Sequence, residues 1–327
     1  MPLSLKVAIW VGIFTAVASR TPLQAATDYP DHTVRIVCAS PTGGPQDMLS
    51  RLLAQWLTRS LGKPVIVENR PGANTIIAAQ NVIEAPADGY TLFLGSDATN
   101  SINPLLHTHL SYKADDFVPI TLMVTIAQQL YVGAQVPAHS LAEFINYAKS
   151  KPGKLNYGTL GIGSTTHLAG ERFTHAAGID MVPIHFKGSQ DLLPALSEDQ
   201  VQLTIITYSG AAAFLQNKSI KALAVSGQKR MPELPDVPTF AEAGFPQFNF
   251  TIWYGLMVRK GTPQGIVDRL GTETNKFLRS DELRGVMAPR FGWDVIGGTQ
   301  AEFADFLTKD RDSYRQIIVD SHIRPLD

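Results

Sequence analysis

Two short segments of the chain place glycines directly before a predicted helix, among hydroxyl and amide side chains. The first covers residues 40–47 (SPTGGPQD) and the second covers residues 160–167 (LGIGSTTH). Glycine lets the backbone approach a bound group closely, and the first N–H groups of a helix have no partner inside the helix. The helix dipole adds positive potential at the same point. Both segments therefore predict a binding site for a small anion such as a carboxylate.

A third segment, residues 186–189 (FKGS), repeats this design, and Lys187 could add charge to it, although a solvated surface lysine is the plainer interpretation. Each segment taken alone also has a purely structural explanation. In that explanation Asp47, Ser164 or Thr165 caps a helix and binds nothing. Three such turns spread over two predicted domains favour a cleft that closes on an anion.

The sequence lacks the signatures of common enzymes and nucleotide-binding sites. It contains no GxGxxG after a strand, no GxxxxGK[ST], no GxSxG and no HExxH. Ser164 and His167 lie three residues apart, but no acid is evident to orient them, and helix capping explains both. The net charge of −1, with no basic run, argues against a nucleic-acid partner. We therefore expect a binding protein and not an enzyme, with no catalytic residue, cofactor or metal.

Short β-branched runs alternate with amphipathic stretches from Val34 onward, which predicts parallel, doubly wound sheets. The predicted strands are residues 34–38, 65–69, 90–95, 155–159, 181–185, 201–206, 222–226 and 253–258. The predicted helices are residues 47–61, 75–84, 141–150, 166–177, 191–196, 266–278 and 301–319. Because this rhythm restarts in the middle of the chain, we expect two α/β domains, with the chain crossing between them more than once.

The N-terminal residues indicate export. Residues 7–17 (VAIWVGIFTAV) are almost wholly apolar, follow a lysine, and precede small residues that end at Ala25 and Ala26. This order is typical of a cleaved secretory signal, and the apolar run is shorter than the roughly 20 residues that a membrane span needs. The single cysteine, Cys38, cannot form an internal disulfide. We expect an exported, soluble protein located in the periplasm.

Eight short segments, in this order, resemble one known family. They are residues 42–47 (TGGPQD), 67–73 (VENRPGA), 88–92 (DGYTL), 102–104 (INP), 152–157 (PGKLNY), 163–171 (GSTTHLAGE), 187–189 (KGS) and 234–239 (LPDVPT). Together they resemble the substrate-binding receptors of tripartite tricarboxylate transporters, often called Bug proteins. The resemblance runs from about Tyr29 to the C-terminus.

This resemblance implies an α/β fold of the type II periplasmic binding protein kind, with two doubly wound domains around a central ligand cleft. We expect a signal peptide at residues 1–26, a discontinuous domain I at 27–126 and 248–327, and domain II at 127–247. The implied partners are a small organic carboxylate, a dicarboxylate or an aromatic acid, and the membrane permease subunits of a secondary transporter. Presentation of the ligand to a two-component sensor kinase is an alternative, and a secreted hydrolase is a weaker one.

The glycine loops and their neighbours supply the expected ligand contacts. By resemblance, Thr42, Gly43 and Gly44 hold a carboxylate together with Gly163, Ser164 and Thr165. The full expected set is Ser40, Thr42, Gly43, Gly44, Asp47, Asn69, Ser96, Asp97, Thr99, Gly163, Ser164, Thr165, His167, Gly188, Ser189, Thr207, Tyr208 and Trp253. Trp253 also fits a plain core aromatic.

Two departures from the family pattern bear on the choice of ligand. Ala39 and Ser40 stand where a proline and an aromatic residue are common, and residues 206–209 (ITYS) replace a Phe-Asp-Asn-like stretch. Without that acid an ammonium group lacks a carboxylate partner, which disfavours an amino-acid ligand. Asp97 keeps that option open. The sequence thus favours a plain or aromatic carboxylate.

Overall fold

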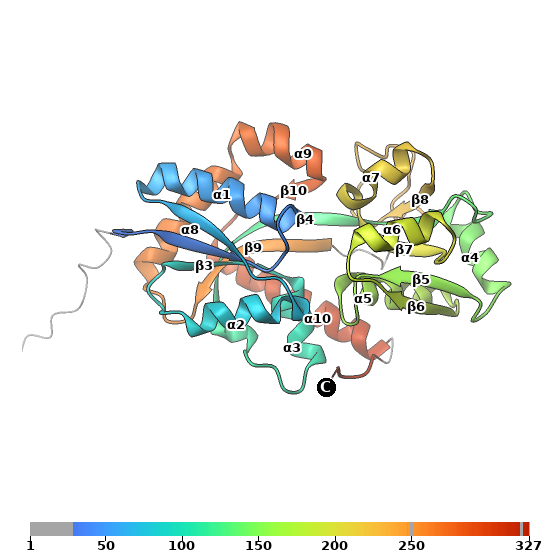
Figure 1. Cartoon of the computed structure of the whole chain (residues 1–327), viewed down its shortest axis with the longest axis horizontal. Coiled ribbons are helices and arrows are strands. Elements are labelled where there is room, and N and C mark those ends of the chain that lie inside the picture. The colour runs from blue at the N-terminus through green and yellow to red at the C-terminus, as the bar shows by residue number, and fades with distance from the viewer. Residues whose placement is uncertain (1–28, 247, 249–250, 321–322, 327) are drawn as a thin grey trace, which may run out of the picture.

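The computed structural model describes residues 29–246, 248, 251–320 and 323–326, and the predicted signal peptide lies outside these residues. Figure 1 shows two lobes joined by long strands. In the described part of the chain, no helix has the length and apolar character needed to cross a membrane.

Lobe I consists of residues 29–127, 251–320 and 323–326. It begins with the predicted alternation: β1 (Val34–Cys38), α1 (Pro45–Leu61), β2 (Val65–Asn69), α2 (Ile76–Glu84) and β3 (Thr91–Ser96). Strands β1, β2 and β3 are parallel. The short elements η1 (Ala73–Thr75), η2 (Ala98–Ile102), α3 (Asn103–Leu106) and η3 (Ala114–Asp116) follow β2 and β3. The C-terminal part adds β9 (Thr251–Arg259), α8 (Gln264–Leu278), η4 (Glu282–Met287), α9 (Ala288–Phe291), β10 (Trp293–Val295) and α10 (Gln300–Asp320).

Lobe II consists of residues 128–248 and repeats the alternation. Its elements are α4 (Leu141–Lys149), β5 (Leu155–Thr159), α5 (Thr165–Ala177), β6 (Met181–His185), α6 (Ser189–Ser197), β7 (Leu203–Thr207), α7 (Tyr208–Gln216) and β8 (Ile220–Val225). Strand β5 lies between β6 and β7 and is parallel to both. The carboxyl ends of these three strands therefore share one edge of the sheet.

Strand β4 (Phe117–Gly133) joins the two lobes and was not predicted from the sequence. Its first part pairs antiparallel with β9, and its last part pairs antiparallel with β7 and β8. The sheets are therefore mixed, whereas the sequence indicated purely parallel ones. The sequence of this strand is a long run of apolar and amide residues that contains Pro119, and its pairing with β9 has two register shifts. It therefore lacks the regular alternation of apolar and polar residues that predicts a strand. The expected boundary between residues 126 and 127 falls inside this strand.

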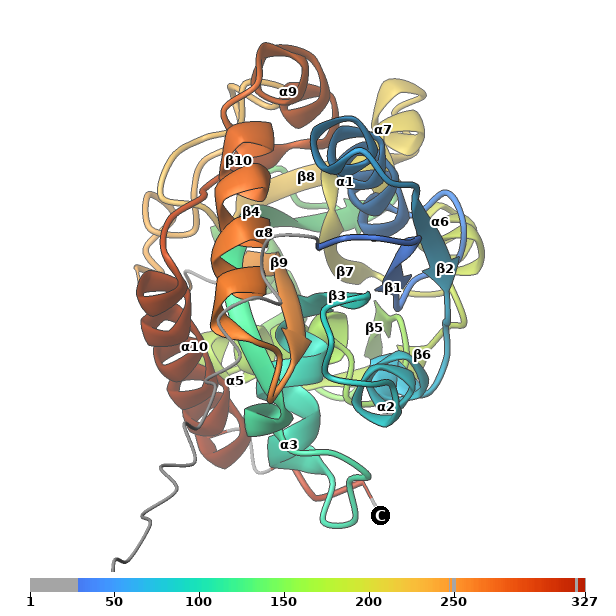
Figure 2. The ribbon, with the colours of Figure 1, turned by 90° about the vertical axis from the view of Figure 1, so that its left-hand side faces the viewer.

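Helices cover both faces of the lobe I sheet (Figure 2). In lobe I, α1 and α8 pack on one face through residues such as Leu53 and Leu270, and α2 and α10 pack on the other through Val82 and Phe303. Lobe II has a core of its own, centred on Phe173. These cores hold the strands rigidly, so the loops at the strand ends keep fixed positions.

Candidate functional site

The loops that follow the parallel strands of the two lobes face each other. Two hydrogen bonds join them: the Thr165 hydroxyl donates to Oδ2 of Asp97 (2.9 Å), and Nδ2 of Asn74 donates to the carbonyl of Gly163 (3.2 Å). Thr165 and Gly163 belong to lobe II, and the other two residues belong to lobe I. We call the space bounded by the loops after β1, β2, β3, β5, β6 and β7 the interlobe site. All three segments selected from the sequence lie on it.

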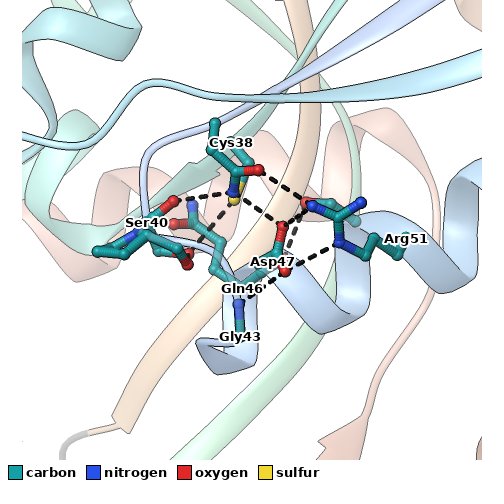
Figure 3. Close-up of polar contacts among 9 residues, drawn as sticks. Cys38, Ser40, Gly43, Gln46, Asp47 and Arg51 are labelled. Carbon is teal, nitrogen blue, oxygen red and sulfur yellow. Dashed lines mark hydrogen bonds and ion pairs between the residues drawn. The ribbon is translucent and has the colours of Figure 1, made fainter.

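The first glycine loop is held by Asp47, as Figure 3 shows. Its buried carboxylate accepts hydrogen bonds from the Gly43 N–H (2.9 Å), from Nε of Arg51 (3.0 Å) and from Nδ2 of Asn69 (2.8 Å). Burial favours the neutral acid, but the donors outweigh it and lower the pKa of Asp47. The Asn69 amide also donates to the Ser40 carbonyl (2.9 Å). Asp47 and Asn69 therefore shape the loop through its internal hydrogen bonds.

Helix α1 begins earlier than the sequence indicated, and Gly44 is its N-cap instead of Asp47. Glycine has no side chain to cap the helix, and Pro45 has no N–H. No described side chain caps α1 from the N-cap position, which leaves the N–H groups of Gln46 and Asp47 at the interlobe site. The Gln46 side chain is anchored on the Leu94 carbonyl (2.7 Å) and fixes this first turn.

Three more helices begin at the same site. Helices α6 and α7 have Gly188 and Thr207 as N-caps, and among the described residues neither N-cap side chain accepts a hydrogen bond from its helix. In α5 the Ser164 hydroxyl caps only the His167 N–H (3.3 Å), so the amides of the first turn remain available. Helices α1, α5, α6 and α7 thus all begin at the carboxyl ends of parallel strands, and each start brings N–H donors and partial positive charge.

The turn before α2 is strained and carries a contact residue that the sequence reasoning missed. Ala73, Asn74 and Thr75 all have positive φ angles, of 46°, 45° and 76°. Such runs of non-glycine residues are rare and tend to occur where function requires them. Asn74 uses this conformation to reach Gly163 and the Asn103 side chain. The only sequence signal was the Arg-Pro-Gly break just upstream.

Asp97 is a buried acid at the interlobe site. It accepts hydrogen bonds at 2.9 Å from the Ala98 N–H, the Thr165 hydroxyl and the Tyr314 hydroxyl. Burial, and secondly the nearby Asp310 carboxylate, raise the pKa of Asp97 to about 7. Asp310 on α10 accepts hydrogen bonds from Ser101 and from the Trp253 indole. The sequence identified Asp97 but gave no sign of its partners on α10.

Tyr254 on β9 is an electrostatic neighbour of this acid, whereas the sequence pointed to the adjacent Trp253. The Trp253 side chain is fully buried between Phe303 and Phe306 of α10. Tyr254 is only partly buried and projects from the opposite face of the strand, because consecutive strand residues alternate. Burial raises the pKa of Tyr254, and Asp97 and Cys38 are its electrostatic neighbours. Tyr254 shares its face with Leu256, which is core on the α1 side.

We expect Trp253→Phe to lower the melting temperature without changing affinity for a carboxylate, because the indole contacts only core side chains and Asp310. Tyr254→Phe should change the free energy of unfolding by no more than about 0.5 kcal/mol, so its melting temperature should stay close to that of the wild type. The same variant should bind the carboxylate more weakly. Calorimetric titration and thermal melts of both variants check this. If only Trp253→Phe binds the carboxylate more weakly, the ligand contact is made by Trp253, as the sequence indicated, and not by Tyr254.

The other expected residues also border the interlobe site. Ser40 and Thr42 lie in the first glycine loop, and the Ser40 hydroxyl contacts Sγ of Cys38 (3.4 Å). Ser96 and Thr99 are buried beside Asp97, and the Thr99 hydroxyl donates to Thr75 (2.8 Å). The lobe II members Gly188, Ser189, Thr207 and Tyr208 form the starts of α6 and α7. The Tyr208 ring packs partly against Ala127, Val225 and Met231. Direct contact with a ligand remains a prediction for every one of these residues.

Comparison with known proteins gives one consistent result. The model of the tripartite tricarboxylate transporter family receptor matches residues 49–322. A solved structure of R. palustris Rpa4515 with adipate is 33% identical, with a TM-score of 0.84 over 91% of this chain and 100% of that one. The periplasmic binding protein BugD is 28% identical, with a TM-score of 0.80 over 90% of this chain and 99% of that one. MatC from Rhodopseudomonas palustris with bound malate is 29% identical, with a TM-score of 0.78 over 89% of this chain and 100% of that one.

These matches confirm the two-domain α/β fold expected from the sequence, and they confirm that the chain is a binding receptor and not an enzyme. Members of the family are periplasmic binding proteins, which agrees with the expected periplasmic location. The chain belongs to the tripartite tricarboxylate transporter receptor family, the family of the Bug proteins, and is a solute-binding receptor of that type.

Proposed function

We propose that this receptor captures a small carboxylic acid, and first of all a dicarboxylate, in the interlobe site and delivers it to the membrane subunits of a secondary transporter. The observation that carries the proposal is that α1, α5, α6 and α7 begin at the strand ends of the two lobes, whose loops are joined by the hydrogen bonds from Thr165 to Asp97 and from Asn74 to Gly163. The N-caps of three of them offer no side-chain acceptor to their own helix. Uncapped N–H groups at a helix start are well suited to a carboxylate.

The grip on the acid group is made mainly by main-chain amides. The cation nearest to the first glycine loop is Arg51, and its guanidinium is already bound to Asp47. In this proposal the α1 and α5 starts hold one carboxylate, and the α6 and α7 starts meet a second polar end. Two relatives support a dicarboxylate, since one was solved with adipate and another with malate.

Binding is coupled to lobe closure. Strand β4 carries the chain between the lobes, and the hydrogen bonds from Thr165 to Asp97 and from Asn74 to Gly163 join the loops directly. An acid bound between helix starts of both lobes adds contacts that only the closed form makes, so it shifts the population toward closure. In the closed form the two lobes have a fixed orientation relative to each other, and both are presented to the transporter.

A thermal-shift screen tests the proposal with adipate, malate, benzoate and the uncharged control adipamide. A ligand that binds only the folded protein stabilises it by about 2.7 kcal/mol at a concentration one hundred times its Kd. We expect a saturable rise in melting temperature with at least one of the three acids and none with adipamide. Equal responses to adipamide and adipate, or no response to any acid, would refute carboxylate capture.

Delivery is tested separately with vesicles that contain the transporter's membrane subunits. The purified receptor should stimulate uptake of the labelled acid that gave the thermal shift. A receptor that binds this acid but leaves uptake unchanged would refute the transport role and keep the capture role.

A further inference from the structure

Gly163 is held from two sides. Its N–H donates to Nδ1 of His167 (3.2 Å), and its carbonyl accepts from the Asn74 side chain of lobe I (3.2 Å). Its φ of 71° lies in the left-handed region, which favours glycine. The position of the second glycine loop therefore depends on a histidine of its own lobe and on a residue of the other lobe.

The contact with Gly163 defines the proton state of His167. A backbone N–H can donate to Nδ1 only when that nitrogen carries no proton, so the neutral ring carries its proton on Nε2. Nε2 lies 3.6 Å from Oε1 of Glu171, one helical turn further along α5. The Tyr157 hydroxyl of β5 donates to the same carboxylate oxygen. A chain of polar contacts thus runs from the glycine loop through His167 and Glu171 to the strand.

Charged and titratable groups face His167 from two further positions. The contact with His167 and the Tyr157 hydrogen bond lower the pKa of Glu171, which is therefore an anion at neutral pH. The His185 ring of β6 lies 5.1 Å away, edge to face, and its Nδ1 contacts the Thr159 hydroxyl (2.7 Å). Burial, together with His167, lowers the pKa of His185. The Glu171 carboxylate and the His185 ring are therefore the titratable groups that lie beside His167.

We infer, resting on the proposed function, that His167 is a positioning residue whose proton state sets ligand affinity. Neutral His167 holds the Gly163 N–H and keeps the glycine loop in its ligand-binding form. Protonation turns Nδ1 from an acceptor into a donor, and two N–H groups then point at each other. The loop has to move, which withdraws the Gly163 carbonyl from Asn74 and shifts the first-turn amides of α5. The receptor therefore releases its acid as the pH falls.

Two variants separate this role from a merely structural one. In His167→Asn, Oδ1 takes the place of Nδ1 as acceptor for the Gly163 N–H and cannot be protonated. In His167→Gln, the amide reaches toward Glu171, but the acceptor close to the main chain is lost. At pH 8 we expect the Asn variant to bind about tenfold more tightly than the Gln variant, since a lost hydrogen bond costs about 1–1.5 kcal/mol.

The first measurement needs no ligand. NMR of protein labelled with ¹⁵N at histidine and glycine, titrated from pH 8 to pH 5.5, should show His167 as the Nε2–H tautomer. The Gly163 amide resonance should move with the His167 titration in the wild type and stay still in His167→Asn. The inference is wrong if the Gly163 amide resonance stays constant while His167 titrates, or if Nδ1 of His167 carries the proton at pH 8. This test does not depend on which ligand the protein binds.

The second measurement is adipate affinity from pH 8 to pH 6, a range in which the carboxyl groups of adipate stay ionised. We expect the wild-type affinity to fall as the pH falls, by up to about tenfold per pH unit, and the profile of His167→Asn to be flat or reversed. Protonation of Asp97 acts in the opposite direction, because it removes a negative charge from the site. An equal fall in both proteins overturns the inference. Absence of adipate binding at every pH counts against the proposed ligand, and the NMR result then decides the role of His167.

Discussion

Replacing Gly43 with valine is expected to abolish the thermal shift with carboxylates while both lobes stay folded. Gly43 has a φ of 89°, and a β-carbon placed there meets no heavy atom within 4 Å. The side chain would therefore enter open space beside the start of α1. A β-branched residue strongly disfavours this φ, so the loop would rearrange and pull its N–H away from Asp47. The first-turn amides of α1 would then lose the position that a carboxylate needs.

The matched control is Gly62→Val at the other end of the same helix. Gly62 has a φ of 74°, it also has no atom within 4 Å of an added β-carbon, and it is the C-cap of α1. Both variants should lose about 1–2 kcal/mol of stability from the left-handed backbone alone. Only the Gly43 variant should lose affinity, by at least about tenfold, because a hydrogen bond to a charged group is worth about 1.5–3 kcal/mol. Calorimetric titration with adipate compares them, and equal losses would show that the first glycine loop does not hold the acid.

The parts of the fold that the sequence predicted well are those made from local repeats. Strands β1, β2, β5 and β6 have the bounds that their β-branched runs indicated, and the glycine and proline breaks between them were visible. Local hydrophobic period and turn chemistry suffice for such elements. Strand β4 was missed because it pairs with four strands in two lobes, and its side chains face different surroundings along its length. No single period describes such a strand.

For the site, the sequence located the donor loops but could not show what each donor contacts. The glycines and hydroxyls of residues 40–47 and 160–167 were evident, yet the Gly43 N–H proves to be bound by Asp47. That contact depends on where α1 begins, and the helix begins two residues before its predicted start. The choice between Trp253 and Tyr254 likewise depended on the face of one strand. Asn74 and Tyr314 reach the site from segments far apart in the chain, so only the tertiary structure brings them together.

Asp97 should make the protein less stable as the pH rises from about 4 to about 7, and Asp97→Asn should remove this loss. The folded pKa of Asp97 is about 7, against an ordinary value of 3.8, because burial and Asp310 disfavour the charged form. Below pH 3.8 the acid is neutral in both the folded and the unfolded states, so it contributes no penalty. Between the two values the unfolded chain gives up the proton and the folded protein keeps it, so stability falls with increasing pH.

The full penalty is reached above pH 7 and amounts to about 4 kcal/mol, at about 1.4 kcal/mol for each pKa unit. The stability of Asp97→Asn relative to wild type should therefore rise between pH 4 and pH 7 and then level off. The variant's carbonyl oxygen can still accept from Thr165 and Tyr314, so its lobes stay joined. Asp305→Asn, on the exposed face of α10, is the control and should parallel wild type. Chemical denaturation of the three proteins across this range measures the difference. If the difference in unfolding free energy between Asp97→Asn and wild type stays constant from pH 4 to pH 7, Asp97 is already charged in the folded protein at pH 4. The difference changes with pH only if the folded protein keeps the Asp97 proton at a pH where the unfolded chain has lost it.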